Sequence, residues 1–223
     1  MIYNDLNIIE YGRAWEYQQE LFAKALSLKD KGKKPDNTLL FCEHPHTITI
    51  GKHGDNKNLL FQESYLNDRG VVLFQIDRGG DVTYHGPGQL VGYPIFDLES
   101  FNIGLRQYIF NVEEIIIRFL ASYNIQSERL EGAAGVWIDT KIPSKTRKIA
   151  AIGVRSSRFV TMHGFALNVN TDLSYFSLIN PCGFVDKGVT SIEIELGYKL
   201  DMEEVKIKMK SLFEEVFIET VSQ

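Results

Sequence analysis

The segment Asn180-Pro181-Cys182-Gly183 holds the residue best suited to nucleophilic chemistry. Cys182 is one of two cysteines in the chain, and its proline and glycine neighbours are typical of a turn rather than of an apolar strand. A free cysteine is most often simply packed in a core, but that explains a Pro-Cys-Gly turn poorly. Gly183 would also allow backbone N–H groups to face a developing oxyanion. Cys182 is therefore a candidate nucleophile.

A nucleophilic cysteine needs a neighbouring cation or base that favours its thiolate. The sequence offers Lys148, His163 and His85 for this role. Lys148 begins the run Lys-Ile-Ala-Ala-Ile-Gly, whose small residues would let a substrate approach, although a lysine at a strand start is usually just solvated. Residue spacing alone leaves both a Cys–Lys and a Cys–His pair open.

A second segment, residues 78–89 (Arg-Gly-Gly-Asp-Val-Thr-Tyr-His-Gly-Pro-Gly-Gln), combines four glycines with several polar side chains. Glycine lets backbone approach a ligand closely, so we predict a ligand-binding loop here rather than a simple turn. The spacing matches neither a dinucleotide-binding nor a phosphate-binding loop. A phosphate loop ending at Gly51-Lys52 would need glycine and serine or threonine where His46 and His53 stand.

The segment Cys42-Glu43-His44-Pro45-His46 resembles a zinc-ligand pattern, because alternate strand residues share one face. Pro45 breaks strand geometry, however, and the chain has no Cys-x-x-Cys pair. We therefore expect Cys42 to be a small buried hydrophobe and expect no metal site.

The overall composition fits an ordinary globular protein: 223 residues, 44% hydrophobic and 24% charged. A net charge of −5 argues against a nucleic-acid binder, and no apolar stretch approaches the ~20 residues of a membrane span. Two cysteines and the lack of a signal peptide predict a cytoplasmic protein. Without an apolar surface stripe, we expect a monomer. One short stretch is rich in basic residues: Lys141, Lys145, Arg147, Lys148, Arg155 and Arg158.

Hydrophobic periodicity predicts the elements that must position these residues. Helices are expected over residues 14–26, 103–123 and 202–221, with a short helix that Asp172 caps. Strands and helices mix without steady alternation, which predicts one α+β domain over residues 1–223 with a mixed, largely antiparallel sheet. Pro94 suggests that its strand is an edge strand or carries a bulge. The predicted strands are residues 38–42, 47–50, 71–76, 90–96, 135–138, 148–155 and 159–169, the last two forming a hairpin.

Four segments, in this order, resemble the octanoyltransferases of lipoate biosynthesis, and the Glu43-His-Pro segment is similar too. The resemblance runs from about residue 39 to residue 193, and the flanking helices carry no signature. His46 stands where the family pattern would have a second proline, and Phe159 where it would have tryptophan. The four segments are residues 78–89, residues 147–155 (Arg-Lys-Ile-Ala-Ala-Ile-Gly-Val-Arg), residues 163–170 (His-Gly-Phe-Ala-Leu-Asn-Val-Asn) and residues 180–183.

The resemblance implies transfer of octanoyl from acyl carrier protein to a lysine of lipoyl domains, in 2-oxoacid dehydrogenases or the glycine-cleavage H protein. It also implies the fold of lipoate ligases and of the catalytic domain of biotin ligases. By the same resemblance, Cys182 carries the acyl group as a thioester and Lys148 lowers the pKa of its thiol. The substrate-binding residues it implies are Arg78, Gly79, Gly80, Asp81, Val82, Thr83, Tyr84, His85, Ala151, Ile152, Gly153, Gly164, Phe165 and Ala166.

Thioester-to-amide transfer is downhill, so we expect no cofactor, in keeping with the missing nucleotide loop. Val82, Tyr84 and residues 150–153 would form the apolar slot, and the basic stretch would meet acidic carrier and lipoyl domains. Three alternatives stay open: an ATP-dependent lipoate-protein ligase, an amidotransferase acting between lipoyl domains, and a binding module without catalysis.

Overall fold

The structure, a computed structural model, describes residues 1–180 and 187–221. The predicted nucleophile, Cys182, lies outside the described residues. The described strands are, in chain order, β1 (Ile2–Ile8), β2 (Thr38–Glu43), β3 (Thr47–Ile50), β4 (Val72–Gln75), β5 (Val82–His85), β6 (Gln89–Ile95), β7 (Glu128–Leu130), β8 (Ala133–Ile138), β9 (Arg147–Ser157), β10 (Val160–Asn168) and β11 (Gly188–Val189).

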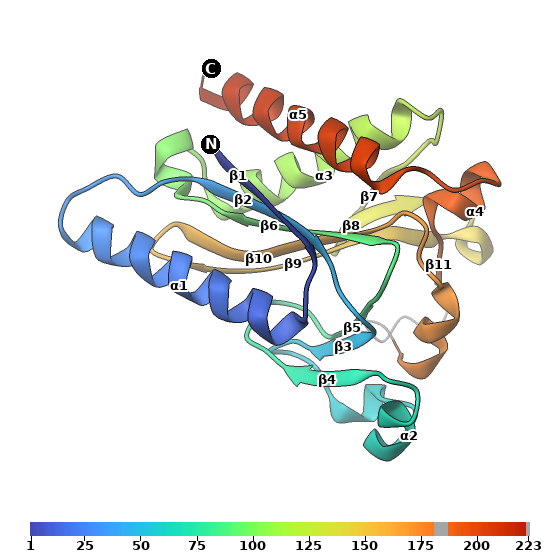
Figure 1. The fold of residues 1–223 in the computed structure, drawn as a ribbon. Coiled ribbons are helices and arrows are strands. Elements are labelled where there is room, and N and C mark those ends of the chain that lie inside the picture. Colours follow the sequence, from blue (N-terminus) through green and yellow to red (C-terminus); the bar gives the residue numbers. More distant parts are fainter. Residues whose placement is uncertain (181–186, 222–223) are drawn as a thin grey trace.

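These strands form two sheets (Figure 1). The large sheet has the order β1-β2-β6-β10-β9-β8-β7, with β11 beside β9, and the small sheet has the order β4-β3-β5. The pairs β1–β2, β3–β4 and β9–β11 are parallel, whereas the other pairs are antiparallel. The predicted α+β class with mixed, largely antiparallel sheets is therefore confirmed.

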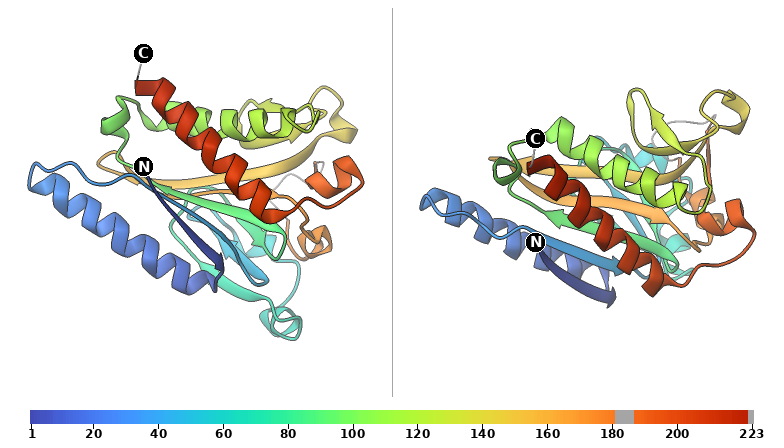
Figure 2. Two further views of the ribbon diagram at one scale, coloured as in Figure 1. Left: turned by 45° about the horizontal axis from the view of Figure 1, so that its top comes forward. Right: turned by 90° about the horizontal axis from the view of Figure 1, so that it is seen from above.

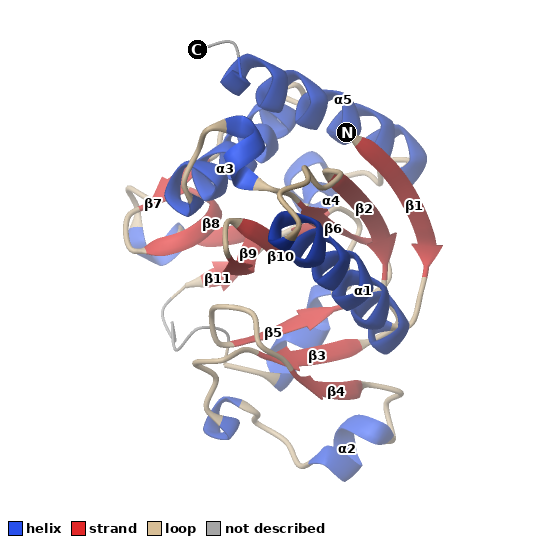
Figure 3. Ribbon diagram, turned by 90° about the vertical axis from the view of Figure 1, so that its left-hand side faces the viewer, coloured by secondary structure: helices blue, strands red, loops and turns tan. Residues whose placement is uncertain are grey.

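Helices cover both faces of the large sheet (Figures 1 and 2). α3 and α5 pack on one face, and α1 packs on the other, where the small sheet also lies (Figure 3). Among the described residues, no helix is both long and apolar enough to cross a bilayer. The α-helices are α1 (Tyr11–Asp30), α2 (Glu63–Asn67), α3 (Leu105–Ala121), α4 (Ile192–Leu196) and α5 (Met202–Val221), and the short 3₁₀ helix η4 covers Leu173–Leu178.

The position of α3 follows from its apolar stripe. Tyr108, Val112, Ile115, Ile116 and Phe119 recur at helical spacing, and all five are fully buried against the large sheet and α5. Because burying one such side chain contributes about 1.5–3 kcal/mol, this face is sufficient to hold the helix on the sheet. The helix predicted over residues 103–123 is thus confirmed as Leu105–Ala121.

β9 and β10 form the predicted hairpin, and its turn is two residues long. Ser157 pairs with Val160, and the turn residues Arg158 and Phe159 have φ values of 50° and 64°. Two left-handed residues in succession match the right-handed twist of the strands they join. The hairpin fixes the register of both strands, which form one wall of the site described below.

The position of β6 corrects one prediction. Pro94 was expected on an edge strand or at a bulge, but β6 lies between β2 and β10 in the interior of the large sheet. The β6–β10 ladder is interrupted opposite Pro94, where His163 has φ 61°, and the register is the same on both sides of the gap. Proline is tolerated there because its missing N–H falls where the ladder is already open.

Candidate functional site

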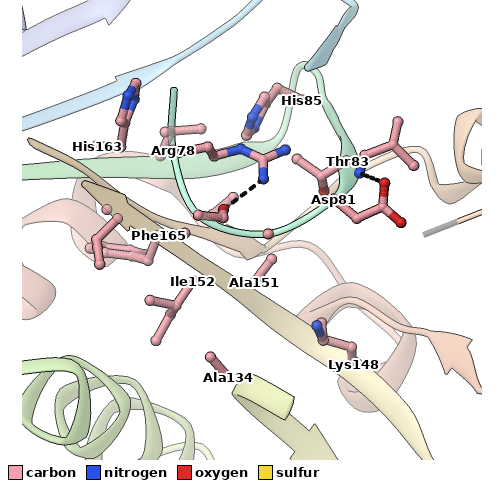
Figure 4. A pocket seen from close by; sticks show the side chains of 18 of the residues that line it. Arg78, Asp81, Thr83, His85, Ala134, Lys148, Ala151, Ile152, His163 and Phe165 are labelled. Atoms are coloured by element: carbon pink, nitrogen blue, oxygen red, sulfur yellow. Dashed lines mark hydrogen bonds between the residues drawn. The ribbon is translucent and has the colours of Figure 1, made fainter. Parts of the chain in front are cut away.

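A cavity of about 590 Å³ lies between β9 and β10 of the large sheet and the glycine-rich segment that leads into β5 (Figure 4). This volume is in the range of about 300–1,000 Å³ that is usual for small-molecule sites. One wall, which we call the polar wall, includes Arg78, His85 and His163. The opposite side, which we call the apolar wall, consists of Leu105, Ile109, Ala134 and Ile152.

Glycines allow three backbone segments to meet at the cavity. Gly153 and Gly164 lie directly opposite each other in the β9–β10 ladder. A Cβ on Gly153 would lie 2.8 Å from the carbonyl oxygen of Gly79, and a Cβ on Gly164 would lie 2.1 Å from that of Gly92. The Gly79 N–H donates to the Val154 carbonyl at 3.0 Å. Only glycine therefore permits the glycine-rich segment to close onto β9.

Arg78 is buried and held by the small sheet. Its Nη2 donates to the carbonyl and to Oγ1 of Thr49 at 3.0 and 2.9 Å, and its Nη1 donates to the Gly79 carbonyl at 3.0 Å (Figure 4). At its other end the glycine-rich segment is fixed by Glu43, whose carboxylate accepts the Gly88 N–H at 2.7 Å. The Glu43-His-Pro segment thus anchors this loop.

Asp81 connects the loop to the chain that precedes residue 181. Its carboxylate accepts from Asn58 Nδ2 at 2.6 Å and from the Val82 N–H at 2.8 Å. The Asn180 N–H in turn donates to the Asn58 carbonyl at 2.8 Å. One side of the undescribed segment 181–186 is therefore tied to the cavity loop.

The other side of that segment returns beside Lys148. β11 pairs with the start of β9, where Val189 is the partner of Lys148, and the Thr190 N–H donates to the Lys148 carbonyl at 2.9 Å. The Lys148 ammonium lies 4.5 Å from the ring centroid of Trp137, within range of a cation–π interaction. Lys148 lines the cavity, so its ammonium and the two ends of segment 181–186 belong to one region.

His163 lies at the opposite end of this stretch of β9. It pairs with Val154, six residues beyond Lys148, a separation of about 20 Å along a strand. Its Nε2 bonds Asp77 Oδ1 at 2.8 Å, while its buried Nδ1 has no hydrogen-bond partner. Burial lowers the pKa of His163, although the hydrogen bond from Asp77 partly opposes that shift. Both groups favour a neutral imidazole that donates from Nε2.

His85 lies on β5 and also faces the cavity. Burial lowers its pKa to about 3, and the nearby His44 and Arg78 contribute in the same direction. The Nδ1 atom bonds the side-chain oxygen of Gln89 at 2.8 Å. His85 is therefore a neutral, fixed hydrogen-bonding group at neutral pH rather than a ready proton donor.

Comparison with known proteins assigns the family. The lipoyl protein ligase A/B catalytic domain family matches residues 10–214. An octanoyltransferase of Parabacteroides distasonis is 60% identical over 215 residues, which cover 96% of this chain and 97% of that protein. This chain belongs to the octanoyltransferase family.

Solved structures share the fold at much lower identity. A bipartite lipoate protein ligase of Thermoplasma acidophilum aligns with a TM-score of 0.68 at 17% identity, covering 97% of this chain and 84% of that one. The biotin protein ligase of Aquifex aeolicus aligns with a TM-score of 0.54 at 13% identity, covering 100% of this chain and 72% of that one. The expected kinship of octanoyltransferases with both ligases is confirmed at the level of fold.

The cavity brings together most of the residues that the octanoyltransferase motifs had suggested as substrate-binding. Tyr84 does not line it: this fully buried ring stacks on Tyr175, and its hydroxyl bonds His46 Nδ1 at 2.7 Å. Tyr84 thus packs the small sheet against η4. The residues that line the cavity are Arg78, Gly79, Gly80, Asp81, Val82, Thr83, His85, Ala151, Ile152, Gly153, Gly164, Phe165 and Ala166, together with Lys148.

The second cysteine of this octanoyltransferase is confirmed as a packed residue. Cys42 is fully buried, and burial raises the pKa of its thiol far above the usual range. His44 is held by the Ile9 carbonyl and the Tyr93 hydroxyl, both at 2.7 Å. Within the described residues, no group of three or more His, Cys, Asp or Glu side chains is arranged to hold a metal ion.

The basic stretch of residues 141–158 is not one positive surface. Arg147 pairs with Glu195 at 2.7 Å, Arg158 pairs with Asp30 at 2.6 Å, and Arg155 pairs with Asp77. These arginines are spread along the eleven residues of β9 and its turn, and each meets a local carboxylate. Lys141 and Lys145 remain exposed near the start of β9.

The sequence did not indicate the residues of α3 and β8 that complete the cavity. Leu105 and Ile109 form the first turns of α3, and Ala134 is in β8. An apolar pair at positions i and i+4 of a helix looks like part of the core stripe, so no chemical signal distinguished it. Strand β5 was also missed, because its glycine-rich flanks made the whole segment look like a loop.

Proposed function

We propose that this octanoyltransferase moves octanoyl from the thioester of acyl carrier protein to a lysine of a lipoyl domain, with Cys182 as acyl carrier and Lys148 as its proton partner. One observation carries the assignment of Lys148: the chain that follows Cys182 returns as β11 directly beside Lys148, in a cavity that the family motifs line. Family membership supports the substrate class.

In the first half-reaction, neutral Lys148 takes the proton of the Cys182 thiol. The thiolate attacks the carbonyl carbon of the octanoyl thioester, and the resulting oxyanion is held by backbone N–H groups. As the tetrahedral intermediate collapses, the carrier thiol leaves with the proton from the Lys148 ammonium. The products are octanoyl-Cys182 and a neutral Lys148.

In the second half-reaction, the amine of the acceptor lysine attacks the octanoyl-Cys182 carbonyl and loses a proton to neutral Lys148. The C–S bond then breaks, Cys182 leaves as a thiolate beside the Lys148 ammonium, and the amide product dissociates. The thiolate returns to the thiol when Lys148 gives the proton back. Both half-reactions balance without ATP or any other co-reactant.

Lys148 is preferred over the two histidines for physical reasons. His163 lies about 20 Å along β9 from Lys148, and Asp77 already occupies its Nε2. His85 is buried and bonded to Gln89, and its pKa of about 3 makes it a poor base near neutral pH.

The same proposal covers partners and location. Acyl carrier protein and the lipoyl domains of 2-oxoacid dehydrogenases and glycine-cleavage H protein are the macromolecular substrates, with exposed Lys141 and Lys145 near the site for acidic partners. The enzyme acts as a cytoplasmic monomer with a single catalytic domain, without nucleic acid, membrane, metal or cofactor.

Intact-mass measurement after mixing with octanoyl–acyl carrier protein tests the covalent step. Wild type should gain the mass of one octanoyl group, and Cys182→Ser should not. Cys42→Ala is the matched control, because Cys42 is fully buried, and it should still gain the octanoyl group. An adduct that persists in Cys182→Ser, or is lost in Cys42→Ala at unchanged thermal stability, would contradict the assignment.

The ATP-dependent ligase alternative is tested with free octanoate, ATP, Mg²⁺ and a lipoyl domain. The transferase should give no octanoylated domain in this mixture, whereas the same domain should be modified when octanoyl–acyl carrier protein replaces the free acid and ATP. Modification from the free acid would instead favour the ligase.

A further inference from the structure

The cavity has chemically different sides, and this difference bears on how an acyl chain lies in it. On one side of β9 are Arg78, His85 and His163, and on the other side, where the start of α3 runs, are Ala134 and Ile152 (Figure 4). The His163 Nδ1 and the amide nitrogen of neighbouring Gln18 are buried without partners. Methylene groups placed there would keep these polar atoms unpartnered, which is unfavourable.

The apolar wall has no such penalty, and it is not closed at its far end. Leu105 and Ile109 line the cavity and also line a second, shallower groove on the surface of α3. Phe110 forms the floor of that groove and is 46% exposed, and Leu105 is 38% exposed. The groove is thus a continuation of the cavity along the first turns of α3.

The pairing of β9 explains why the cavity can pass to this side. β8 pairs with β9 only from Arg147 to Ala151. In the described chain, the edge of β9 beyond Ala151 is covered only by the single bond from Gly79 to Val154. Ile152, just past the end of the β8 ladder, therefore faces Leu105 and Ile109 across open space rather than another strand.

We propose that the acyl chain lies along the apolar wall and that its end is directed to the α3 groove, so that the enzyme accepts acyl chains longer than octanoyl. This inference rests on the proposed function, since it assumes an acyl group attached near Lys148. The occupant of the groove is the distal end of that chain. Each methylene that leaves water there strengthens binding about fourfold.

The test compares octanoyl-, decanoyl- and dodecanoyl–acyl carrier protein as donors to one lipoyl domain, with kcat/KM as the readout. Wild type should use decanoyl and dodecanoyl within about tenfold of octanoyl, because the added methylenes find an apolar surface. Rejection of both longer donors by more than about a hundredfold would mean that the cavity is closed, and would overturn the inference.

Two variants locate the chain. Ile109→Trp fills the passage and should lower the dodecanoyl-to-octanoyl ratio of kcat/KM at least about tenfold. Ile117→Trp is the matched control: Ile117 lies on the same helix, is also partly exposed and does not line the cavity, so the ratio should not change. Equal ratios in both variants, with both folded by circular dichroism, would overturn the inference.

A photoreactive donor gives a readout that does not depend on turnover. A dodecanoyl thioester with a terminal diazirine should, on irradiation, label peptides that contain Leu105 or Ile109. Labelling at Arg78 or His163 would place the chain on the polar wall and overturn the inference. If wild type transfers octanoyl but not longer chains, only this inference fails, whereas no transfer from any donor refutes the proposed function itself.

Discussion

The two ends of β9 face one cavity but differ in what surrounds them. At the Lys148 end, β9 is paired on both sides, with β8 and with β11. At the Val154 end it is paired with β10 and receives one bond from Gly79. Both ends carry a nitrogen base, Lys148 or His163. The difference shows that the chemical role depends on where the chain containing Cys182 returns, rather than on the type of base.

The strongest test of this comparison is at Lys148. Lys148→Ala should lower kcat/KM about 10²–10⁴-fold, the usual contribution of a positioned proton-transfer group. Lys148→Arg keeps the positive charge but cannot accept a proton. It should therefore form octanoyl-Cys182 faster than Lys148→Ala in a stopped, intact-mass time course, yet pass octanoyl to the acceptor as slowly. Equal rates of adduct formation in both variants would refute the role of the charge.

A second test concerns the glycine contact at the Val154 end. Gly153→Ala places a Cβ 2.8 Å from the Gly79 carbonyl oxygen, and a backbone atom cannot move aside cheaply. We expect a loss of about 1–3 kcal/mol in the free energy of unfolding, measured with urea, and reduced transfer. Gly12→Ala is the control, because its Cβ would be 3.5 Å from the Phe74 ring, and it should be neutral or stabilising.

A smaller effect is expected at His163. His163→Gln keeps a hydrogen-bonding group near Asp77, and the residue lies about 20 Å along β9 from Lys148. Octanoyl transfer should fall less than about tenfold, well below the loss in Lys148→Ala. A loss as large as that of Lys148→Ala, with unchanged thermal stability, would mean that the catalytic base had been assigned to the wrong end.

The smallest effect is a pH dependence of stability from the polar wall. The pKa of folded His85 is about 3, below its unfolded value near 6.5, so protonation favours the unfolded chain. The stabilisation is complete above pH 6.5 and is lost as the pH falls towards 3. His85 should contribute about 1 kcal/mol to the loss of unfolding free energy between pH 7.5 and 5.5. Urea titrations of His85→Gln should show a smaller loss over that range.

Much of the fold could be predicted from hydrophobic spacing. The α3 stripe and the β9–β10 hairpin have strong local patterns, and both agree with the structure. β1, β5 and β7 were missed, since β7 is three residues long and β5 lies among glycines. Pro94 misled because proline usually marks an edge, whereas here a local gap in the ladder accommodates it.

The site was predictable to the extent that its chemistry is written in residue types. The glycine-rich segment, residues 151–153 and Lys148 were singled out, and they do face one cavity. Leu105 and Ile109 carry no chemical signal, so only their position in space connects them to the cavity. The choice between Lys148 and His163 likewise depends on strand register, which residue spacing does not reveal.

The opposed glycines Gly153 and Gly164 have a consequence for mutational scanning. Neither has a side chain that can react, yet each is enclosed by backbone oxygen atoms that no substitution can displace. In a scan scored by growth on lipoylation alone, both positions would look as intolerant as catalytic residues. Scoring cellular abundance in parallel would separate them, because a variant at Gly164 should be lost from the folded pool, whereas Lys148→Ala should persist there without activity.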